Sequence, residues 1–171
     1  MDYLEEALKQ YFGYDSFLPG QRQIIEQVLT GRDAFVLMPT GAGKSLVYQL
    51  SSLLLPGVTI VISPLIALMQ DQVERLETNG IAATFVNSSL SPSERSQRER
   101  AALTGNLKLL YVAPERLLTG NFLSLLDQIK ERVGLSLLAV DEAHCVSEWD
   151  MIFVQSIASW GSCVSAIPIH Q

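Results

Sequence analysis

Short apolar runs that alternate with helical patterns constrain this chain more than any other feature. Apolar residues at helical spacing lie between the runs, as in the stretch from Leu65 to Leu76. Continuous apolar runs are typical of strands that are buried on both faces. Strands alternating with helices imply right-handed crossovers, so we expect an α/β fold with a parallel sheet and helices on both faces. The expected strands are 34–38, 58–62 and 135–140, with weaker candidates at 82–86 and 107–112.

Helix start signals add detail to this outline. Residues 2–12 are expected to form a short helix, and Pro19 is expected to open a second one that ends at Gly31. The sequence Ser91-Pro92-Ser93-Glu94 is a capping box with proline at the first helical position. A further helix is therefore predicted to begin there.

A glycine-rich loop follows the first strong strand and precedes a helix, which is the context that a phosphate-binding loop requires. Glycines allow the backbone amides and the helix N-terminus to point at a phosphate. Lys44 would reach the β- and γ-phosphates, and the Ser45 hydroxyl would bind Mg²⁺. The strict motif has glycine at position 38, where this chain has Met38. The expected ATP-binding residues here are Thr40, Gly41, Ala42, Gly43, Lys44 and Ser45.

An acidic pair follows the last apolar run, in the sequence Asp141-Glu142-Ala143-His144. Open parallel sheets bind ligands at the carboxyl ends of their strands, so Asp141 is expected beside Lys44 and Ser45. There Asp141 would hold Mg²⁺ through water, and Glu142 would orient or deprotonate the attacking water. His144 would couple the phosphate state to neighbouring segments. We therefore predict catalytic roles for Lys44, Asp141, Glu142 and His144, and Mg²⁺ ligation by Ser45 and Asp141.

Composition bounds the remaining possibilities. The net charge of −6 argues mildly against a free-standing nucleic-acid binder, although a local basic patch stays possible. Two cysteines and two histidines without metal-ligand spacing predict no zinc site and favour a reduced cytoplasmic protein. The acidic N-terminus has no apolar run, so no signal peptide is expected.

The ordered motifs resemble those of the RecQ-type DNA helicases of superfamily two. Residues 12–21 are similar to the family's adenine-recognition motif, which implies that Tyr14 stacks on adenine and Gln21 reads its polar edge. Residues 63–73, 111–117 and 141–149 carry the rest of the match. The resemblance implies a RecA-like P-loop NTPase lobe, 3'-5' unwinding coupled to ATP hydrolysis, and DNA as partner. Segments 63–73 and 111–117 face the single strand in relatives. Two departures stand out: Leu18 where relatives usually have arginine, and Gln70 where lysine is common.

The segment after Trp149 leaves the family pattern. Residues 151–171 contain no Asp, Glu, Lys or Arg. In relatives the tryptophan precedes a loop close to Gly-His-Asp-Phe-Arg-Pro-Glu-Tyr. Restoring one base after the codon of Trp149 permits this loop in order, with its Asp forced by the single codon of Met151. We infer a lobe at 1–150 and a frameshift-derived tail at 151–171 that does not pack. A membrane span is the alternative reading of the tail, which its serines and Pro168 weaken.

Three hypotheses follow for function. The chain is expected to be a truncated RecQ-type helicase, a module that binds ATP–Mg²⁺ without unwinding, or an unstable fragment. The sheet is expected to be incomplete at its C-terminal end, with an unprotected edge. Loss of later motifs, including the arginine fingers, implies that the 171 residues alone do not hydrolyse ATP at a helicase-like rate.

Overall fold

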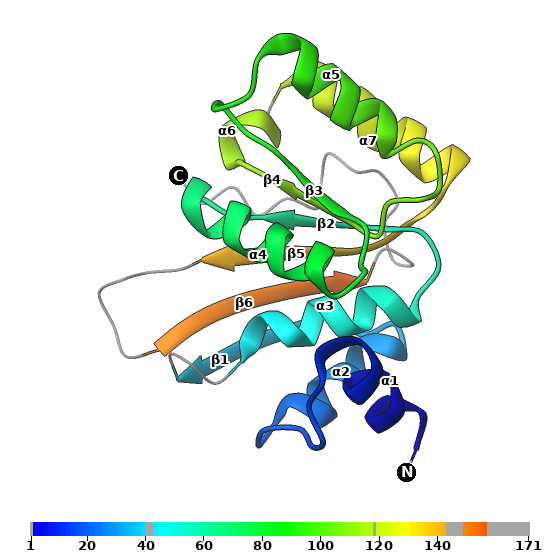
Figure 1. The fold of residues 1–171 in the computed structure, drawn as a ribbon, viewed down its shortest axis with the longest axis vertical. Helices are drawn as coiled ribbons and strands as arrows, with labels where there is room; N and C mark the ends of the chain where they lie inside the picture. Colours follow the sequence, from blue (N-terminus) through cyan, green and yellow to red (C-terminus); the bar gives the residue numbers. More distant parts are fainter. Residues whose placement is uncertain (1, 40–42, 118, 143–148, 157–171) are drawn as a thin grey trace.

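A six-stranded sheet runs through the centre of the computed structural model, which describes residues 2–39, 43–117, 119–142 and 149–156 (Figure 1). The order across the sheet is β1-β6-β5-β2-β4-β3. β2 pairs with β4 and β5, and β3 pairs with β4, all in parallel. The strands are β1 (Ala34–Pro39), β2 (Val58–Ile62), β3 (Ala83–Val86), β4 (Leu109–Val112), β5 (Leu135–Glu142) and β6 (Trp149–Ser156).

Helices connect the strands, so the expected α/β fold is confirmed for the first five strands. Each expected strand is present with small shifts at its ends. The capping box of Ser91 and Glu94 is also confirmed, with both reciprocal hydrogen bonds formed. The helices are α1 (Tyr3–Phe12), α2 (Gln21–Leu29), α3 (Lys44–Leu54), α4 (Ile66–Thr78), α5 (Pro92–Ala101), α6 (Pro114–Leu117) and α7 (Gly120–Arg132).

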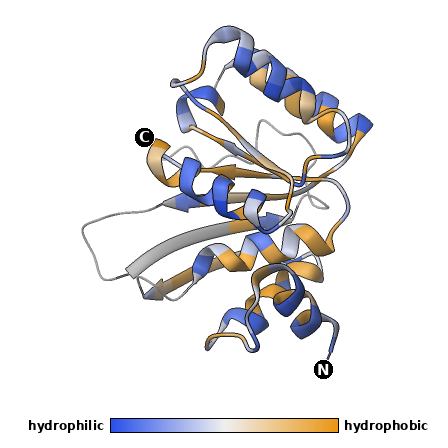
Figure 2. Cartoon of the chain, in the orientation of Figure 1, coloured by the Kyte–Doolittle hydropathy of each residue, from blue (hydrophilic) through white to orange (hydrophobic). Residues whose placement is uncertain are grey.

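The two faces of the sheet are covered by different helices. α2, α3 and α4 bury one face, where Tyr48 and Met69 pack against Val61 and Ala139. α6 and α7 bury the other face over β2, β4 and β5, with Phe122 at the centre. In Figure 2 α5 is largely hydrophilic, and no residue of this helix is buried. The sheet is therefore a shared wall between two apolar cores.

The outer face of β1 differs from the expectation of a strand buried on both sides. Side chains of β1 alternate between buried and exposed, and Phe35 and Leu37 are 67% and 54% exposed. β1 lies at one edge of the sheet, where α2 covers its inner face. In the described ranges, the second core contains no β1 residue, so a continuous apolar run here does not mean burial on both faces.

Strand β6 overturns the expectation that nothing after residue 150 packs. It runs antiparallel between β1 and β5 and pairs with both, from Ala34 to Pro39 and from Leu137 to Glu142. Val154 is fully buried in the first core. The backbone amides and carbonyls of β1 and β5 need hydrogen-bond partners. The backbone of a neighbouring strand supplies them whatever side chains that strand carries. The apolar, β-prone residues 151–154 meet that demand, so β5 is not an edge of the sheet.

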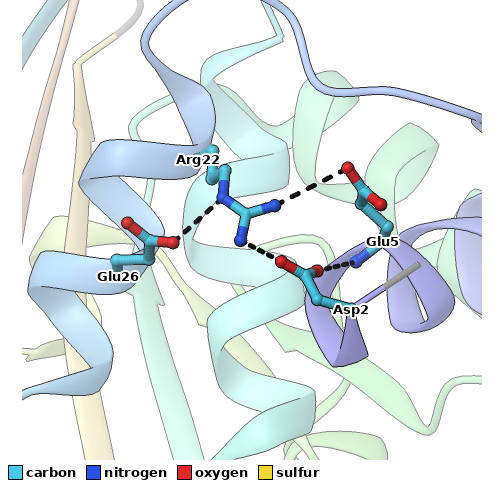
Figure 3. A network of polar contacts seen from close by, with 4 residues as sticks. All are labelled: Asp2, Glu5, Arg22 and Glu26. Carbon is cyan, nitrogen blue, oxygen red and sulfur yellow. Dashed lines mark hydrogen bonds and ion pairs between the residues drawn. The ribbon is translucent and has the colours of Figure 1, made fainter.

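The N-terminal helices are tied together by charged contacts. Arg22 on α2 contacts Asp2, Glu5 and Glu26, with its Nε 3.0 Å from Glu26 Oε1 (Figure 3). Asp2 also caps α1 by accepting a hydrogen bond from the Glu5 amide. The second helix begins at Gln21 rather than at Pro19. Gly20 has a φ of 86°, which is not helical, so the helix starts only after this residue. α1 and α2 thereby form a unit that packs on α3.

Candidate nucleotide-binding site

The carboxyl ends of β1 and β5 bring together the two charged residues of the predicted site. Lys44 begins α3 just after β1, and Asp141 lies near the end of β5. Lys44 Nζ lies 2.9 Å from Asp141 Oδ1, and their side chains are 13% and 1% exposed. Such a buried pair places a cation and a carboxylate within reach of one ligand.

Gly43 shapes the start of α3. It adopts a φ of 72°, a left-handed conformation that L side chains rarely adopt, and it precedes a helix that has no side-chain cap. A Cβ at this position would lie 2.5 Å from Gln21 Nε2. The uncapped helix N-terminus beside Lys44 fits an anionic phosphate.

Gln21 joins the N-terminal segment to the glycine-rich loop. Its Oε1 accepts a hydrogen bond from the Leu18 amide at 2.8 Å, and its Nε2 donates to the Gly43 carbonyl at 2.9 Å. Gln21 is 2% exposed. The side chain expected to read adenine is thus held against the backbone of the loop that would bind phosphate.

An open pocket lies between these segments and α4. Tyr14 and Leu18 from the N-terminal segment line it, as do Gly43, Lys44 and Ser45. Tyr14 is 58% exposed, so its ring is available for stacking. α4 supplies the facing wall with Leu68, Asp71, Gln72 and Arg75, and Asn79 follows at the end of the helix.

A buried cluster of polar side chains lies beneath the pocket. The Tyr48 hydroxyl lies 2.9 Å from Gln72 Oε1 and 3.2 Å from Asp141 Oδ2. Tyr111 packs edge-on against Tyr48, and its hydroxyl accepts a hydrogen bond from Gln49 Nε2 at 3.0 Å. Burial, reinforced by Tyr111 and Asp141, raises the pKa of Tyr48 well above its ordinary value, so the hydroxyl keeps its proton.

Comparison with known proteins identifies the family. The family model described as DEAD/DEAH box helicase matches residues 18–168. The chain belongs to this family.

RecQ proteins are among the helicases most similar to the chain. It is 45% identical over 162 residues to the ATP-dependent DNA helicase RecQ of Haemophilus influenzae, covering 95% of this chain and 26% of the relative. It is 44% identical over 146 residues to RecQ of Bacillus subtilis, covering 85% and 24%. A further relative is the ATP-dependent DNA helicase Q-like 5 of Arabidopsis thaliana, at 45% over 150 residues, covering 88% and 16%. The chain thus spans about a quarter of the bacterial relatives' length.

Part of the site expected of a helicase lies outside the described residues. This holds for Thr40, Gly41, Ala42 and His144, and for the side chain of Glu142. Of the remaining predicted residues, the structure brings Lys44 and Asp141 into contact and places Ser45, Gln21 and Tyr14 around one pocket. In the described part of the chain, no helix is long and apolar enough to cross a membrane.

The donors of the helicase site suit Mg²⁺ better than a soft metal. Within the residues that the structure describes, no group of three or more His, Cys, Asp or Glu side chains could hold a metal. Mg²⁺ does not need such a cage, because it is usually bound by one or two carboxylates, waters and substrate phosphates. Asp141, the Ser45 hydroxyl and a nucleotide together would supply oxygen ligands of that kind.

Sequence reasoning assigned no role to Tyr48 or Gln72. Tyr48 lies four residues after Lys44, which places both on one side of α3. Gln72 is a polar residue within the apolar face of the α4 pattern. Both positions were visible in the sequence, but only the packing of α3 against α4 and β5 brings them to Asp141.

Proposed function

We propose that the chain is the ATP-binding part of a RecQ-type DNA helicase that couples 3'-5' unwinding to ATP hydrolysis. The observation that supports this most is the buried contact of Lys44 with Asp141 at the ends of β1 and β5. The left-handed Gly43 and the uncapped start of α3 add the geometry of a phosphate site. The similarity to RecQ proteins supplies the substrate class.

Each residue of the proposed site has a role in binding or hydrolysis. Residues 40–45 would enclose the phosphates of ATP, with Lys44 at the β- and γ-phosphates. Ser45 and Asp141 would hold Mg²⁺, which supplies positive charge to the phosphate oxygens. Glu142 would act on the attacking water, and His144 would transmit the phosphate state. Tyr14 and Gln21 would bind adenine.

The proposed partner is DNA with a single-stranded part. Residues 63–73 and 111–117 would contact its phosphates, as the resemblance implies. α4 begins within the first of these segments and also lines the nucleotide pocket. A cytoplasmic location, at the nucleoid when the protein acts on DNA, follows from this proposal.

A module that binds nucleotide without unwinding is the second candidate for these 171 residues. The chain spans about a quarter of its bacterial relatives, and ATP turnover in helicases needs an arginine finger worth about 10³–10⁵ in rate. We expect phosphate release from the 171-residue chain to stay at background with saturating single-stranded DNA. DNA-stimulated release at a helicase-like rate would contradict the binding-module alternative.

Nucleotide binding is tested by titrating a fluorescent ATP analogue with Mg²⁺ against the chain and the Lys44→Ala variant. We expect Lys44→Ala to abolish detectable binding, because the cation at the phosphates is lost. Lys130→Ala, which removes an exposed lysine on α7, is the matched control and should bind normally. Equal affinities of the chain and Lys44→Ala would refute the assignment.

Stability has to be measured alongside, because Lys44→Ala leaves Asp141 without its cation in a buried position. Asp141→Asn provides a second test that keeps the shape of the side chain. We expect this variant to bind the analogue with little dependence on Mg²⁺. An unchanged Mg²⁺ dependence in a folded Asp141→Asn variant would argue against the metal role of Asp141.

A further inference from the structure

Three elements of the site meet at one hydroxyl group. Tyr48, on α3, lies between Asp141 on β5 and Gln72 on α4. We propose that Tyr48 is a positioning residue that joins the Asp141 carboxylate to the α4 wall of the nucleotide pocket. This inference rests on the proposed function, because it gives the occupancy of that site a route to α4.

The Tyr48 hydroxyl can donate its proton to only one of its two neighbours at a time. A tyrosine hydroxyl has one proton to donate, and both neighbours present acceptor oxygens, at 2.9 Å and 3.2 Å. Only one of the two hydrogen bonds can be fully formed at a time. The proton therefore goes to whichever oxygen is the stronger acceptor.

The packing around Tyr48 fixes the position of its ring. Tyr48 is fully buried and packs edge-on against Tyr111 at 6.5 Å between ring centroids. The rise in the pKa of Tyr48 that burial causes keeps the hydroxyl a donor. Since the ring is fixed, a change in hydrogen bonding has to be taken up by rotation of the hydroxyl and by Gln72.

The state of the phosphate site determines which acceptor is stronger. A carboxylate accepts more strongly than a neutral amide. In the free chain Asp141 already shares its negative charge with Lys44, 2.9 Å away. When a nucleotide draws Lys44 to its phosphates and divalent Mg²⁺ takes its place beside Asp141, the carboxylate becomes a weaker acceptor, and the proton of Tyr48 moves further toward Gln72. Gln72 lies on α4 and lines the pocket, and its oxygen is already the nearer acceptor at 2.9 Å, so the hydrogen bond between α4 and α3 becomes stronger. Binding of nucleotide and Mg²⁺ thus stabilises α4, which overlaps the proposed DNA-contacting segment 63–73.

Hydrogen exchange of the α4 amides measures this coupling directly in the 171-residue chain. Exchange is followed with and without a non-hydrolysable ATP analogue and Mg²⁺. In the unaltered chain we expect loading to slow exchange in α4 by up to about fivefold, the effect of one hydrogen bond that becomes fully formed. In Tyr48→Phe, which keeps the ring and removes the hydroxyl, loading should leave α4 exchange unchanged while the analogue still binds.

Two further variants make the result decisive. Ser51→Ala removes another buried hydroxyl of α3, which donates to the Val47 carbonyl at 2.7 Å, and should keep the fivefold change. Gln72→Leu cuts the connection at a half-buried position if Tyr48→Phe does not fold, and should also abolish the change. A change that persists in folded Tyr48→Phe or Gln72→Leu would overturn the inference, as would the absence of any change in the unaltered chain.

Failure of the proposed function would look different. Binding of the analogue is measured in the same samples, and Lys44→Ala is included as the variant that should not bind. No binding by the unaltered chain, or equal binding by Lys44→Ala, would overturn both the nucleotide site and the inference. Normal binding that depends on Lys44, with α4 exchange indifferent to Tyr48, would overturn the inference alone.

Discussion

Strands β5 and β6 lie side by side in the sheet, but they reach their places for different reasons. β5 pairs in parallel with β2 and carries Asp141 to the pocket end of the sheet. β6 runs antiparallel to β5 and carries none of the residues of the predicted site. Both strands bury a side chain completely in the same core, Leu137 on β5 and Val154 on β6.

The comparison separates two demands that a sheet makes on a sequence. Chemistry at the strand ends requires particular residues in a particular order, as in Lys44 and Asp141. Filling a position between two strands requires only a backbone that pairs and side chains that tolerate burial. The segment 149–156 meets the second demand, and this explains how residues that depart from the expected loop sequence form a central strand.

Removing β6 is the harshest test of this comparison. A chain ending at residue 148 leaves β1 and β5 without their shared partner, so we expect it to lose cooperative thermal unfolding and nucleotide binding. The matched control ends at Ser156 and keeps β6; it should melt like the whole chain. Circular dichroism against temperature distinguishes them. An unchanged melting curve for the shorter chain would show that β6 contributes nothing to the fold.

Alanine substitutions compare the two strands residue by residue. Leu137→Ala should lower the free energy of unfolding by about 2–5 kcal/mol, because it opens a cavity in the core. Val154→Ala removes fewer carbon atoms and should cost about 1–3 kcal/mol if β6 packs as firmly as β5. Urea denaturation measures both. A full cost for Leu137→Ala with none for Val154→Ala would mean that β6 pairs without packing.

The sequence predicted the position of β5 and of its residue Asp141, but it did not predict β6. The runs at 58–62 and 135–140 predicted their strands, and the rule that ligands bind at the carboxyl ends of parallel strands placed Asp141 beside Lys44. The direction of β6 was not predictable, because it depends on the vacancy between β1 and β5. The same holds for the contact of Tyr48 with Gln72, since no local pattern specifies which helices pack together.

The boundary of the family lobe at residue 150 stays a prediction. The family match extends to residue 168, and β6 includes residues 151–156. We continue to propose a frameshift origin for 151–171, and the nucleotide sequence around codon 149 tests it. An uninterrupted reading frame in independently determined genes, with the same residues after Trp149, would contradict this origin.

Position 18 tests the pocket to which β5 carries Asp141. Leu18 lines the pocket and is 48% exposed, where the resemblance leads us to expect arginine. Leu18→Arg adds a cation near the phosphate site and should tighten binding of the ATP analogue by about two- to fivefold. Leu18→Gln has similar polarity without charge and should change affinity less. A weaker affinity for Leu18→Arg would show that the pocket has adapted to leucine.

The contacts of Arg22 with Asp2, Glu5 and Glu26 serve as a reference, because they involve neither β5 nor β6. These partners are exposed, so Arg22→Ala should lower the melting temperature less than either alanine substitution in the core. A hydrogen bond from Arg22 lowers the pKa of Asp2, so this contribution is present at neutral pH and is lost as pH falls through that lowered pKa. The difference in melting temperature between the unaltered chain and Arg22→Ala should therefore shrink as the solution becomes acidic. Melting curves of both proteins at neutral and acidic pH measure it.

The bare outer face of β1 has a consequence for the fate of this chain in a cell. Phe35 and Leu37 point away from the helix-covered side at the edge of the sheet, and both are more than half exposed. Adjacent exposed apolar side chains on an edge strand form the kind of surface that chaperones bind and that promotes self-association. We therefore expect quality control at this face, as well as thermodynamic stability, to set the lifetime of the folded chain.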